Sequence, residues 1–337
     1  MDTIFLPALL SLAGLGALFG GGLAFASKKF HVEIDPRIAK IIDALPGVNC
    51  GACGKPGCSG FAAAVAAGEI EPSGCTPGGA DTADEIAEIM GVEVEVGEPT
   101  VAVVRCGGGK KEAKDKYEYF GIPTCLAATL VDQGPKACQY GCLCFGDCCE
   151  VCPFDALHMG DNGLPIVDDD KCTGCGLCVA ACPRNIMEII PARVQIYIAC
   201  RSQDRGKAVK EVCEVGCNGC SLCANEKTTP SGAIKMDNFL PIEDWSIEDN
   251  MIAARHKCPT NSFIDKVKHR TKFIIDASCD GCGDCVKVCP VKKCITGEPE
   301  QVHHIDSELC IGCGWCVPVC QPKAIQMFGA LAYQHND

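Results

Sequence analysis

The stretch Cys172-Thr-Gly-Cys175-Gly-Leu-Cys178-Val-Ala-Ala-Cys182-Pro183 shows the pattern that organises this chain. Three cysteines spaced C-x2-C-x2-C, with Cys-Pro three residues later, are typical of iron–sulfur ligation. Similar runs recur to the C-terminal end and account for most of the 31 cysteines among 337 residues. We therefore predict a series of small modules, each built around [4Fe-4S] clusters held by cysteine thiolates.

Two other uses of cysteine fit this spacing less well. Disulfide-rich modules are normally short and secreted, whereas this chain is long and its thiols stand in tight runs. Zinc ribbons use pairs of C-x2-C and have no need of triplets. The sequence contains no C-x-x-C-H, no Walker A motif and no strand-linked GxGxxG, so haem, nucleotide and flavin sites are not expected.

The composition argues against one large hydrophobic core. Aromatic residues make up 6% of the chain, which also has 37 glycines and 20 prolines. In small modules metal binding supplies much of the folding free energy, so metal-free protein should be largely unfolded. The formal net charge of -13 argues against nucleic acid as a partner.

The N-terminal segment is long and apolar. Residues 3–27 carry no charge, and such a stretch is long enough to cross a bilayer as a helix. Lys28 and Lys29 follow directly, which by the positive-inside rule puts the rest of the chain in the cytoplasm. A signal peptide would have Lys or Arg before a shorter apolar stretch. We predict a single-pass anchor, residues 1–29, in the inner (cytoplasmic) membrane.

A first cysteine module, residues 30–92, follows the anchor. Asp35-Pro36 predicts a helix start, and Pro46-Gly47 predicts its end. Ser59 is the predicted N-cap of a second, alanine-rich helix over Phe61–Ala67. The module offers four thiolates for one cluster: Cys50, Cys53, Cys58 and Cys75.

Two cysteine runs in residues 136–191 resemble the bacterial two-cluster ferredoxin. The second run is the stretch quoted above, whereas the first has irregular spacing and contains the additional Cys144 and Cys149. In that ferredoxin the fourth cysteine of each run ligates the cluster of the other run. The resemblance therefore implies two sets: Cys138, Cys142 and Cys148 with Cys182, and Cys172, Cys175 and Cys178 with Cys152.

Residues 192–262 contain a degenerate form of the same unit. Its first run lacks a fourth cysteine, whose place Lys227 takes, and its second run is reduced to Cys258-Pro259. Under crossed ligation these losses remove one cluster and leave the other complete. One set of ligands follows: Cys217, Cys220, Cys223 and Cys258.

An internal repeat leaves an alternative open for this set. Two predicted strands, Val101–Arg105 and Val194–Ala199, are each followed by a cysteine and later by a C-x-x-G-C element. By this repeat Cys213 could be a ligand in place of Cys220. The cysteines outside the sets are expected to be buried structural thiols: Cys106, Cys125, Cys144, Cys149, Cys200, Cys213 and Cys294.

Residues 263–337 contain both runs again. Crossed ligation gives two more sets: Cys279, Cys282 and Cys285 with Cys320, and Cys310, Cys313 and Cys316 with Cys289. The whole chain then carries six [4Fe-4S] clusters. The predicted fold class is α+β: a transmembrane helix, a four-cysteine domain, a strand and helix connector over 93–135, and tandem modules mostly like the two-cluster ferredoxin.

The order of anchor, four-cysteine domain and tandem ferredoxin modules is similar to the B subunit of the Rnf complex. The likeness covers essentially the whole chain and is closest at Lys136–Cys142, Val151–Ala156 and Lys171–Gly176. It implies an electron-transfer subunit of a membrane ferredoxin:NAD+ oxidoreductase, which takes electrons from soluble reduced ferredoxin. Partner subunits, reached through the membrane helix and the first cluster domain, would bind NAD+ and transport Na+ or H+.

Two other functions compete with this interpretation. The chain could serve another membrane oxidoreductase, such as a hydrogenase or a quinone-reducing complex, or its clusters could merely hold a scaffold together. The four-cysteine domain directly after an anchor disfavours the first alternative. We expect this domain to be the electron exit, with the C-terminal clusters nearer the point where electrons enter.

Because ferredoxins are acidic and this chain is acidic too, docking should need a local basic patch. Two stretches qualify, although an ordinary solvated face is the simpler interpretation of each. The first comprises Lys266, Lys268, His269, Arg270 and Lys272, with Lys287, Lys292 and Lys293 nearby in sequence, and the second comprises Lys110, Lys111, Lys114 and Lys116.

Overall fold

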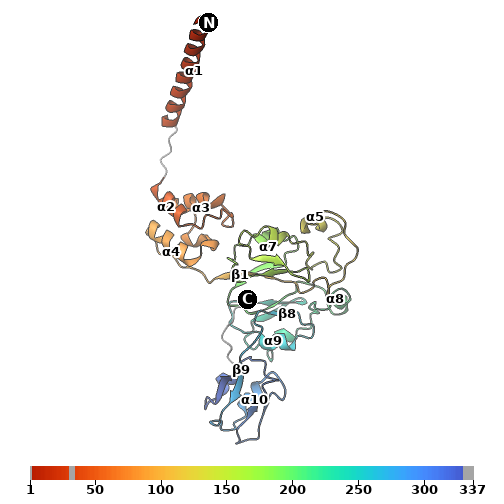
Figure 1. Cartoon of the computed structure of the whole chain (residues 1–337). Helices are drawn as coiled ribbons and strands as arrows, with labels where there is room; N and C mark the ends of the chain where they lie inside the picture. Colours follow the sequence, from red (N-terminus) through yellow and green to blue (C-terminus); the bar gives the residue numbers. More distant parts are fainter. Residues whose placement is uncertain (1, 30–34, 329–337) are drawn as a thin grey trace. The chain divides into compact units, whose positions relative to one another are not determined.

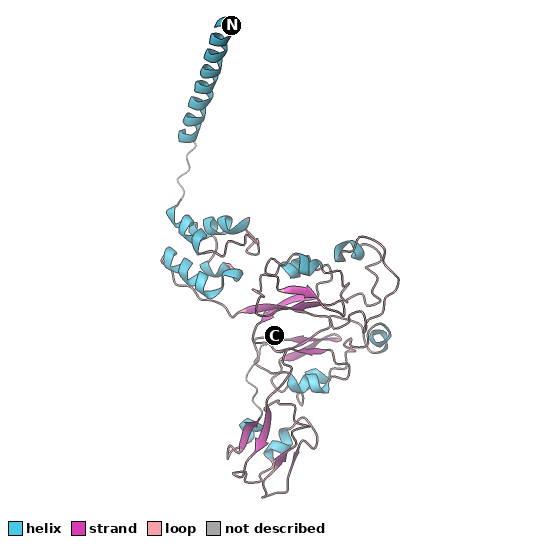
Figure 2. Cartoon of the chain, viewed as in Figure 1, coloured by secondary structure: helices cyan, strands magenta, loops and turns pink. Residues whose placement is uncertain are grey.

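The computed structural model of the chain describes residues 2–29 and 35–328. The chain divides into two compact units, Met1–Glu95 and Val96–Asp337. The first unit is helical, and the second combines short strands with short helices (Figure 2). This mixture is the α+β class predicted from the sequence.

The N-terminal segment forms one helix, α1 (Asp2–Lys29), with Lys28 and Lys29 in its last turn (Figure 1). Among the described residues, Leu10–Lys29 is long and apolar enough to cross a membrane, with a mean hydropathy of 1.6. Its large apolar side chains are exposed; Leu12 and Leu18, for example, are each 72% exposed. A continuous apolar surface of this kind suits a lipid environment.

Three further helices make the first cluster domain: α2 (Pro36–Ala44), α3 (Gly57–Ala66) and α4 (Gly79–Met90), with 3-10 turns η1 (Pro72–Gly74) and η2 (Thr76–Gly78). Ile41, Phe61 and Ile86, one from each helix, are buried in a shared core. The predicted start of α2 is confirmed, because the Asp35 carboxylate accepts the backbone N–H of Arg37 at 2.8 Å.

The predicted cap of α3 is wrong. The helix begins at Gly57, before Ser59, and no side chain caps it from the N-cap position. Instead, the side-chain oxygen of Asn49 accepts the backbone N–H of Cys58 at 2.8 Å. The side chain of Asn49, in the cysteine loop, thus accepts a backbone N–H group of the first helical turn that has no partner within the helix. Ser59 is not needed as a cap, and the helix begins two residues before it.

The second unit repeats one topology three times. In each module the first strand pairs antiparallel with the last, the two middle strands form a hairpin, and short helices lie within or beside the cysteine runs. The first module contains β1 (Thr100–Val104), α5 (Cys125–Thr129), α6 (Asp147–Glu150), β2 (Leu157–Met159), β3 (Pro165–Val167), α7 (Leu177–Ala181) and β4 (Met187–Pro191). The second contains β5 (Ile196–Ile198), α8 (Lys207–Val212), η3 (Leu222–Ala224), β6 (Ile234–Asp237), β7 (Leu240–Glu243), α9 (Ile252–Lys257) and β8 (Phe263–Asp265). The third contains β9 (Lys272–Ile275), α10 (Asp284–Val288), β10 (Ile295–Thr296), β11 (His304–Ile305), α11 (Cys316–Val319) and β12 (Ile325–Phe328).

Strand pairing shows how far each module extends. β1 lies in the stretch predicted as a connector, 93–135, and pairs with β4, from Thr100 opposite Pro191 to Val104 opposite Met187. β8 lies beyond residue 262 and pairs with β5. The outer strands therefore begin and end each module, and the cysteine runs lie between them.

Candidate metal centres

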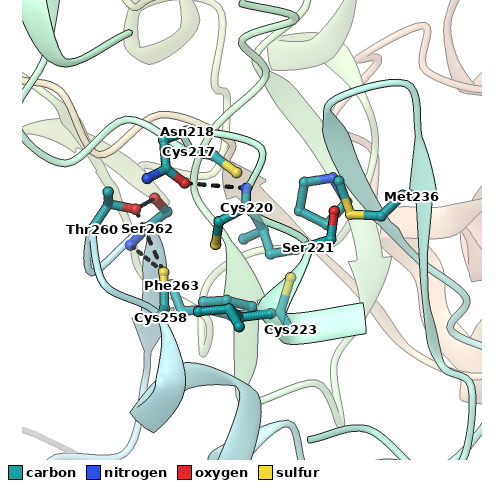
Figure 3. Close-up of a pocket in the computed structure, with 13 residues that line it drawn as sticks. Cys217, Asn218, Cys220, Ser221, Cys223, Met236, Cys258, Thr260, Ser262 and Phe263 are labelled. Carbon is teal, nitrogen blue, oxygen red and sulfur yellow. Dashed lines mark hydrogen bonds between the residues drawn. The ribbon is translucent and has the colours of Figure 1, made fainter. Parts of the chain in front are cut away.

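Four cysteines of the second module surround one cavity of about 340 Å³. Figure 3 shows their side chains around it. The rest of the wall is largely apolar and includes Ile198, Met236 and Phe263. The four cysteines come from the loop before η3, from η3 itself and from the residue after α9: Cys217, Cys220, Cys223 and Cys258.

This is the set predicted from crossed ligation, and Cys213 is not among the lining residues. The sulfur of Cys258 accepts the Ser262 N–H at 3.4 Å. Burial raises the pKa of the Cys223 thiol to about 12, so without metal it is protonated at neutral pH. Iron binding must therefore release a proton from this thiol, which couples metal binding to pH.

The first cluster domain has a cavity of the same kind, about 340 Å³, with Leu45 and Phe61 in its wall. Burial raises the pKa of Cys75, a backbone hydrogen bond from Gly78 partly offsets this, and the thiolates of Cys58, Cys50 and Cys53 raise the pKa further. All four predicted cysteines line the cavity: Cys50, Cys53, Cys58 and Cys75.

The third module shows the crossed arrangement. A cavity of about 320 Å³ is lined by Cys289 from the first run together with three cysteines of the second run, Cys310, Cys313 and Cys316, and also by the buried Cys294, which lies outside the predicted sets. The remaining set lies in the same small core, where Cys285 is buried and Cys320 packs against it. The thiolates of Cys279 and Cys282 add to the effect of burial in raising the pKa of Cys285.

In the first module, strand β1 contacts the cysteine set predicted around Cys172. The backbone N–H of Ala102 in β1 donates a hydrogen bond to the Cys172 sulfur at 3.3 Å. Burial raises the pKa of Cys178 to about 12, and the thiolates of Cys172 and Cys175 add to the shift. Cys152 packs against the same buried cluster.

The other predicted set of this module is less simple. Cys142 and Cys148 are buried, and Cys182 packs beside them. Burial lowers the pKa of Arg184, and the thiolates of Cys138, Cys182, Cys125 and Cys142 partly offset this effect. Arg184 therefore stands among four thiols, one of which, Cys125, lies outside every predicted set.

Among the described residues, no three His, Cys, Asp or Glu side chains converge on a position that a single metal ion could occupy. The cysteines surround cavities, and these cavities combine at least four sulfur donors with a largely apolar wall. Soft thiolate donors in fours, around a space larger than one ion, fit a [4Fe-4S] cluster.

The two candidate docking patches differ in structure. Lys266 is paired with Asp169 at 2.8 Å, and Arg270 is paired with Asp265 at 2.7 Å. Two of the four Lys and Arg side chains in 266–272 are thus paired within the chain, whereas Lys268, Lys292 and Lys293 are exposed. In the second patch Lys116 pairs with Asp132 at 2.9 Å, and the other three lysines are exposed as well: Lys110, Lys111 and Lys114.

Comparisons with known proteins match iron–sulfur families over three stretches of the chain. Residues 45–77 match a family model described as "Putative Fe-S cluster", and residues 165–188 and 303–326 match the "4Fe-4S binding domain" family. The B subunit of the Na(+)-translocating ferredoxin:NAD(+) oxidoreductase complex of Acetobacterium woodii is 40% identical, over 82% of this chain and 83% of that protein. The chain belongs to this B-subunit family. The B subunit of the ion-translocating oxidoreductase complex of Methanosarcina acetivorans is 37% identical, over 87% of this chain and 98% of the relative.

A further family member, from Clostridium ljungdahlii, is the B subunit of a proton-translocating ferredoxin:NAD(+) oxidoreductase complex and is 44% identical over 78% of this chain. Membership in the B-subunit family agrees with the resemblance seen in the sequence. It supports [4Fe-4S] clusters, a membrane location and a role as an oxidoreductase subunit, and it does not favour a hydrogenase or quinone-reducing complex.

Proposed function

We propose that this chain is the membrane-anchored electron-transfer subunit of an ion-translocating ferredoxin:NAD+ oxidoreductase. The observation that carries the proposal is the set of three cavities, each lined by the four cysteines of one predicted set, with Cys294 as a fifth in the third module. The relatives, which are named as B subunits of such complexes, support the same function.

Six [4Fe-4S] clusters, one on each predicted set, are part of this proposal. When bound, each cluster supplies one-electron transfer. The protein holds the thiolates in place and keeps water away with apolar residues such as Phe61 and Phe263. Backbone N–H groups that donate to sulfur, as Ser262 does to Cys258, stabilise the thiolate charge and help to set the potential.

The topology and the partners are proposals as well. Lys28 and Lys29, at the end of α1, support a single-pass helix with residues 35–337 on the cytoplasmic side. Soluble reduced ferredoxin would donate electrons, and the exposed Lys110, Lys111 and Lys114 offer it a basic surface. NAD+ and the transported Na+ or H+ would bind to other subunits, which the chain meets through α1 and the first cluster domain.

The proposal can be tested on the full chain in anaerobic detergent solution. Reduced ferredoxin should bleach its visible absorbance, and Cys223→Ala should lower its iron and acid-labile sulfide by about four each, the content of one cluster. Colourless protein that contains zinc, or sulfur accounted for by disulfides, would contradict the proposal.

A further inference from the structure

Two cysteines outside the predicted sets occupy equivalent positions in the first and second modules. Cys106 follows β1 and Cys200 follows β5, and both are buried. The Cys106 sulfur accepts the backbone N–H of Cys142 at 3.4 Å, and the Cys200 sulfur accepts that of Cys217 at 3.3 Å. Each is therefore hydrogen-bonded to the backbone of a predicted cluster ligand in its own module.

The backbone brings the two equivalent positions together. Gly107, directly after Cys106, donates its N–H to the carbonyl of Ala199, directly before Cys200, at 2.9 Å. Both cysteines thus lie where the first module meets the second.

A short extended segment places two more cysteines at the same junction. Ala113 pairs antiparallel with Cys213, and Asp115 pairs antiparallel with Lys136. The Ala137 N–H donates to the Lys114 carbonyl at 2.9 Å, which continues the second pairing toward Cys138. The 113–115 segment is thus hydrogen-bonded on one side next to Cys213 and on another next to Cys138.

Gly108 shows how close the sulfurs are. A Cβ atom added there would lie 2.9 Å from the Cys213 sulfur and 3.9 Å from the Cys106 sulfur. The glycines of the two C-x-x-G-C elements are also alike: a Cβ at Gly141 would lie 3.6 Å from the Cys138 sulfur, and one at Gly216 would lie 3.6 Å from the Cys213 sulfur.

We propose that Cys106, Cys138, Cys200 and Cys213 hold a seventh [4Fe-4S] cluster at the junction of the first and second modules. The proposal rests on the proposed function, in which the predicted sets carry such clusters.

A buried cation lies near the proposed site. Lys136, 4% exposed, is two residues before Cys138 and pairs with Asp115 at 3.2 Å. Cys106 is hydrogen-bonded to Cys142 and Cys200 to Cys217, so the proposed site adjoins one predicted ligand of the cluster in each module. The seventh cluster would accept one electron from a reduced cluster in one module and pass it to the cluster in the other, and no covalent bond would form or break.

The set of Cys142, Cys148 and Cys182 then needs another fourth ligand, and Cys125 is placed for it. Phe145 occupies the position where the middle cysteine of a C-x2-C-x2-C run would stand, three residues from both Cys142 and Cys148. Asp147 fixes the start of α5 by accepting the Cys125 N–H at 2.7 Å.

Iron and acid-labile sulfide per chain, measured on anaerobically purified full-length protein, test this assignment. The wild type should contain about 28 iron atoms with seven clusters, against about 24 with six. Cys200→Ala and Cys213→Ala should each remove about four iron atoms, and the double variant should remove the same four because both thiols serve one cluster. Cys125→Ala with Cys138→Ala should remove about eight, because they serve two.

Two further variants make the test decisive. Cys149→Ala should retain all the iron, and Cys223→Ala should lose about four atoms. Unchanged iron in Cys200→Ala beside a loss in Cys223→Ala would overturn the seventh site and leave the proposed function standing. No loss in Cys223→Ala would count against the proposed function itself. Should Cys200→Ala fail to fold, the wild-type count of about 28 or about 24 decides the question.

Discussion

The guanidinium of Arg105 lies 2.6 Å from the carboxylate of Glu243, and these side chains are 4% and 0% exposed. Arg105 follows β1 of the first module, whereas Glu243 ends β7 of the second. The other carboxylate oxygen of Glu243 accepts the N–H of Ile198 in β5 at 2.5 Å. One buried ion pair thus joins the two modules directly beside Cys106.

Removing one partner of this pair should be costly. Glu243→Ala leaves the Arg105 charge buried and the Ile198 N–H without its acceptor, so we expect the free energy of unfolding to fall by about 3–5 kcal/mol. Urea denaturation of the anaerobic holoprotein, followed by circular dichroism, measures the change. The matched control is Glu211→Ala, whose partner Lys207 is 89% exposed; it should cost less than about 1 kcal/mol. Equal losses in the two variants would show that burial does not decide the effect.

Ferredoxin docking should depend on the free lysines. Reversing Lys110, Lys111 and Lys114 to Glu should slow the reduction of this chain by ferredoxin roughly tenfold at low salt, with a smaller effect at high salt, because electrostatic steering is screened. Stopped-flow absorbance measures the rate. Exposed lysines elsewhere, Lys210, Lys227 and Lys257, provide a triple variant of equal charge change. The same slowing in both variants would point to net charge alone.

The sequence predicted those ligands whose spacing is local. The cysteines of the runs that begin at Cys217 and Cys310 lie within a few residues of one another. The crossed ligation known from two-cluster ferredoxins then predicted Cys258 and Cys289 as the fourth ligands. The structure places both with their expected sets around a cavity. Such runs can be recognised in a sequence because the cluster that they bind determines the spacing of their cysteines.

Other features depend on contacts between distant segments. The pairing of β1 with β4 joins residues about ninety positions apart, and no local sequence pattern predicts it. The ion pair of Lys266 with Asp169 joins different modules, so the sequence could not show that part of the first basic patch is paired within the chain. Cys125 has no spacing relationship to its neighbours, whereas the repeat that contains Cys106 and Cys200 was visible but gave no reason to group them.

Iron removal should unfold the modules but spare the anchor. The cores are small, with Phe273, Ile295, Ile305 and Ile325 supplying most of the apolar burial of the third module outside its cysteines. Anaerobic chelation should therefore abolish most of the β signal in circular dichroism and expose residues 96–328 to protease. The helical signal of α1 in detergent should persist, and restoring iron and sulfide should reverse the change. Retention of protease resistance without iron would show that the cores suffice on their own.

Deletion of residues 1–29 should release the chain from the membrane without loss of iron. The apolar side chains of α1 that the structure describes are exposed, as Leu23 is at 71%, so they contribute little to the core of the cluster domains. The truncated protein should appear in the soluble fraction with its full iron content, and ferredoxin should still reduce it. Electron delivery to membrane vesicles that hold the partner subunits should fall steeply, because the chain is no longer confined to their surface.

A control that replaces residues 1–29 with an unrelated transmembrane helix separates tethering from recognition. Restored electron delivery means that α1 only tethers the chain, whereas continued loss means that partner subunits recognise α1 itself.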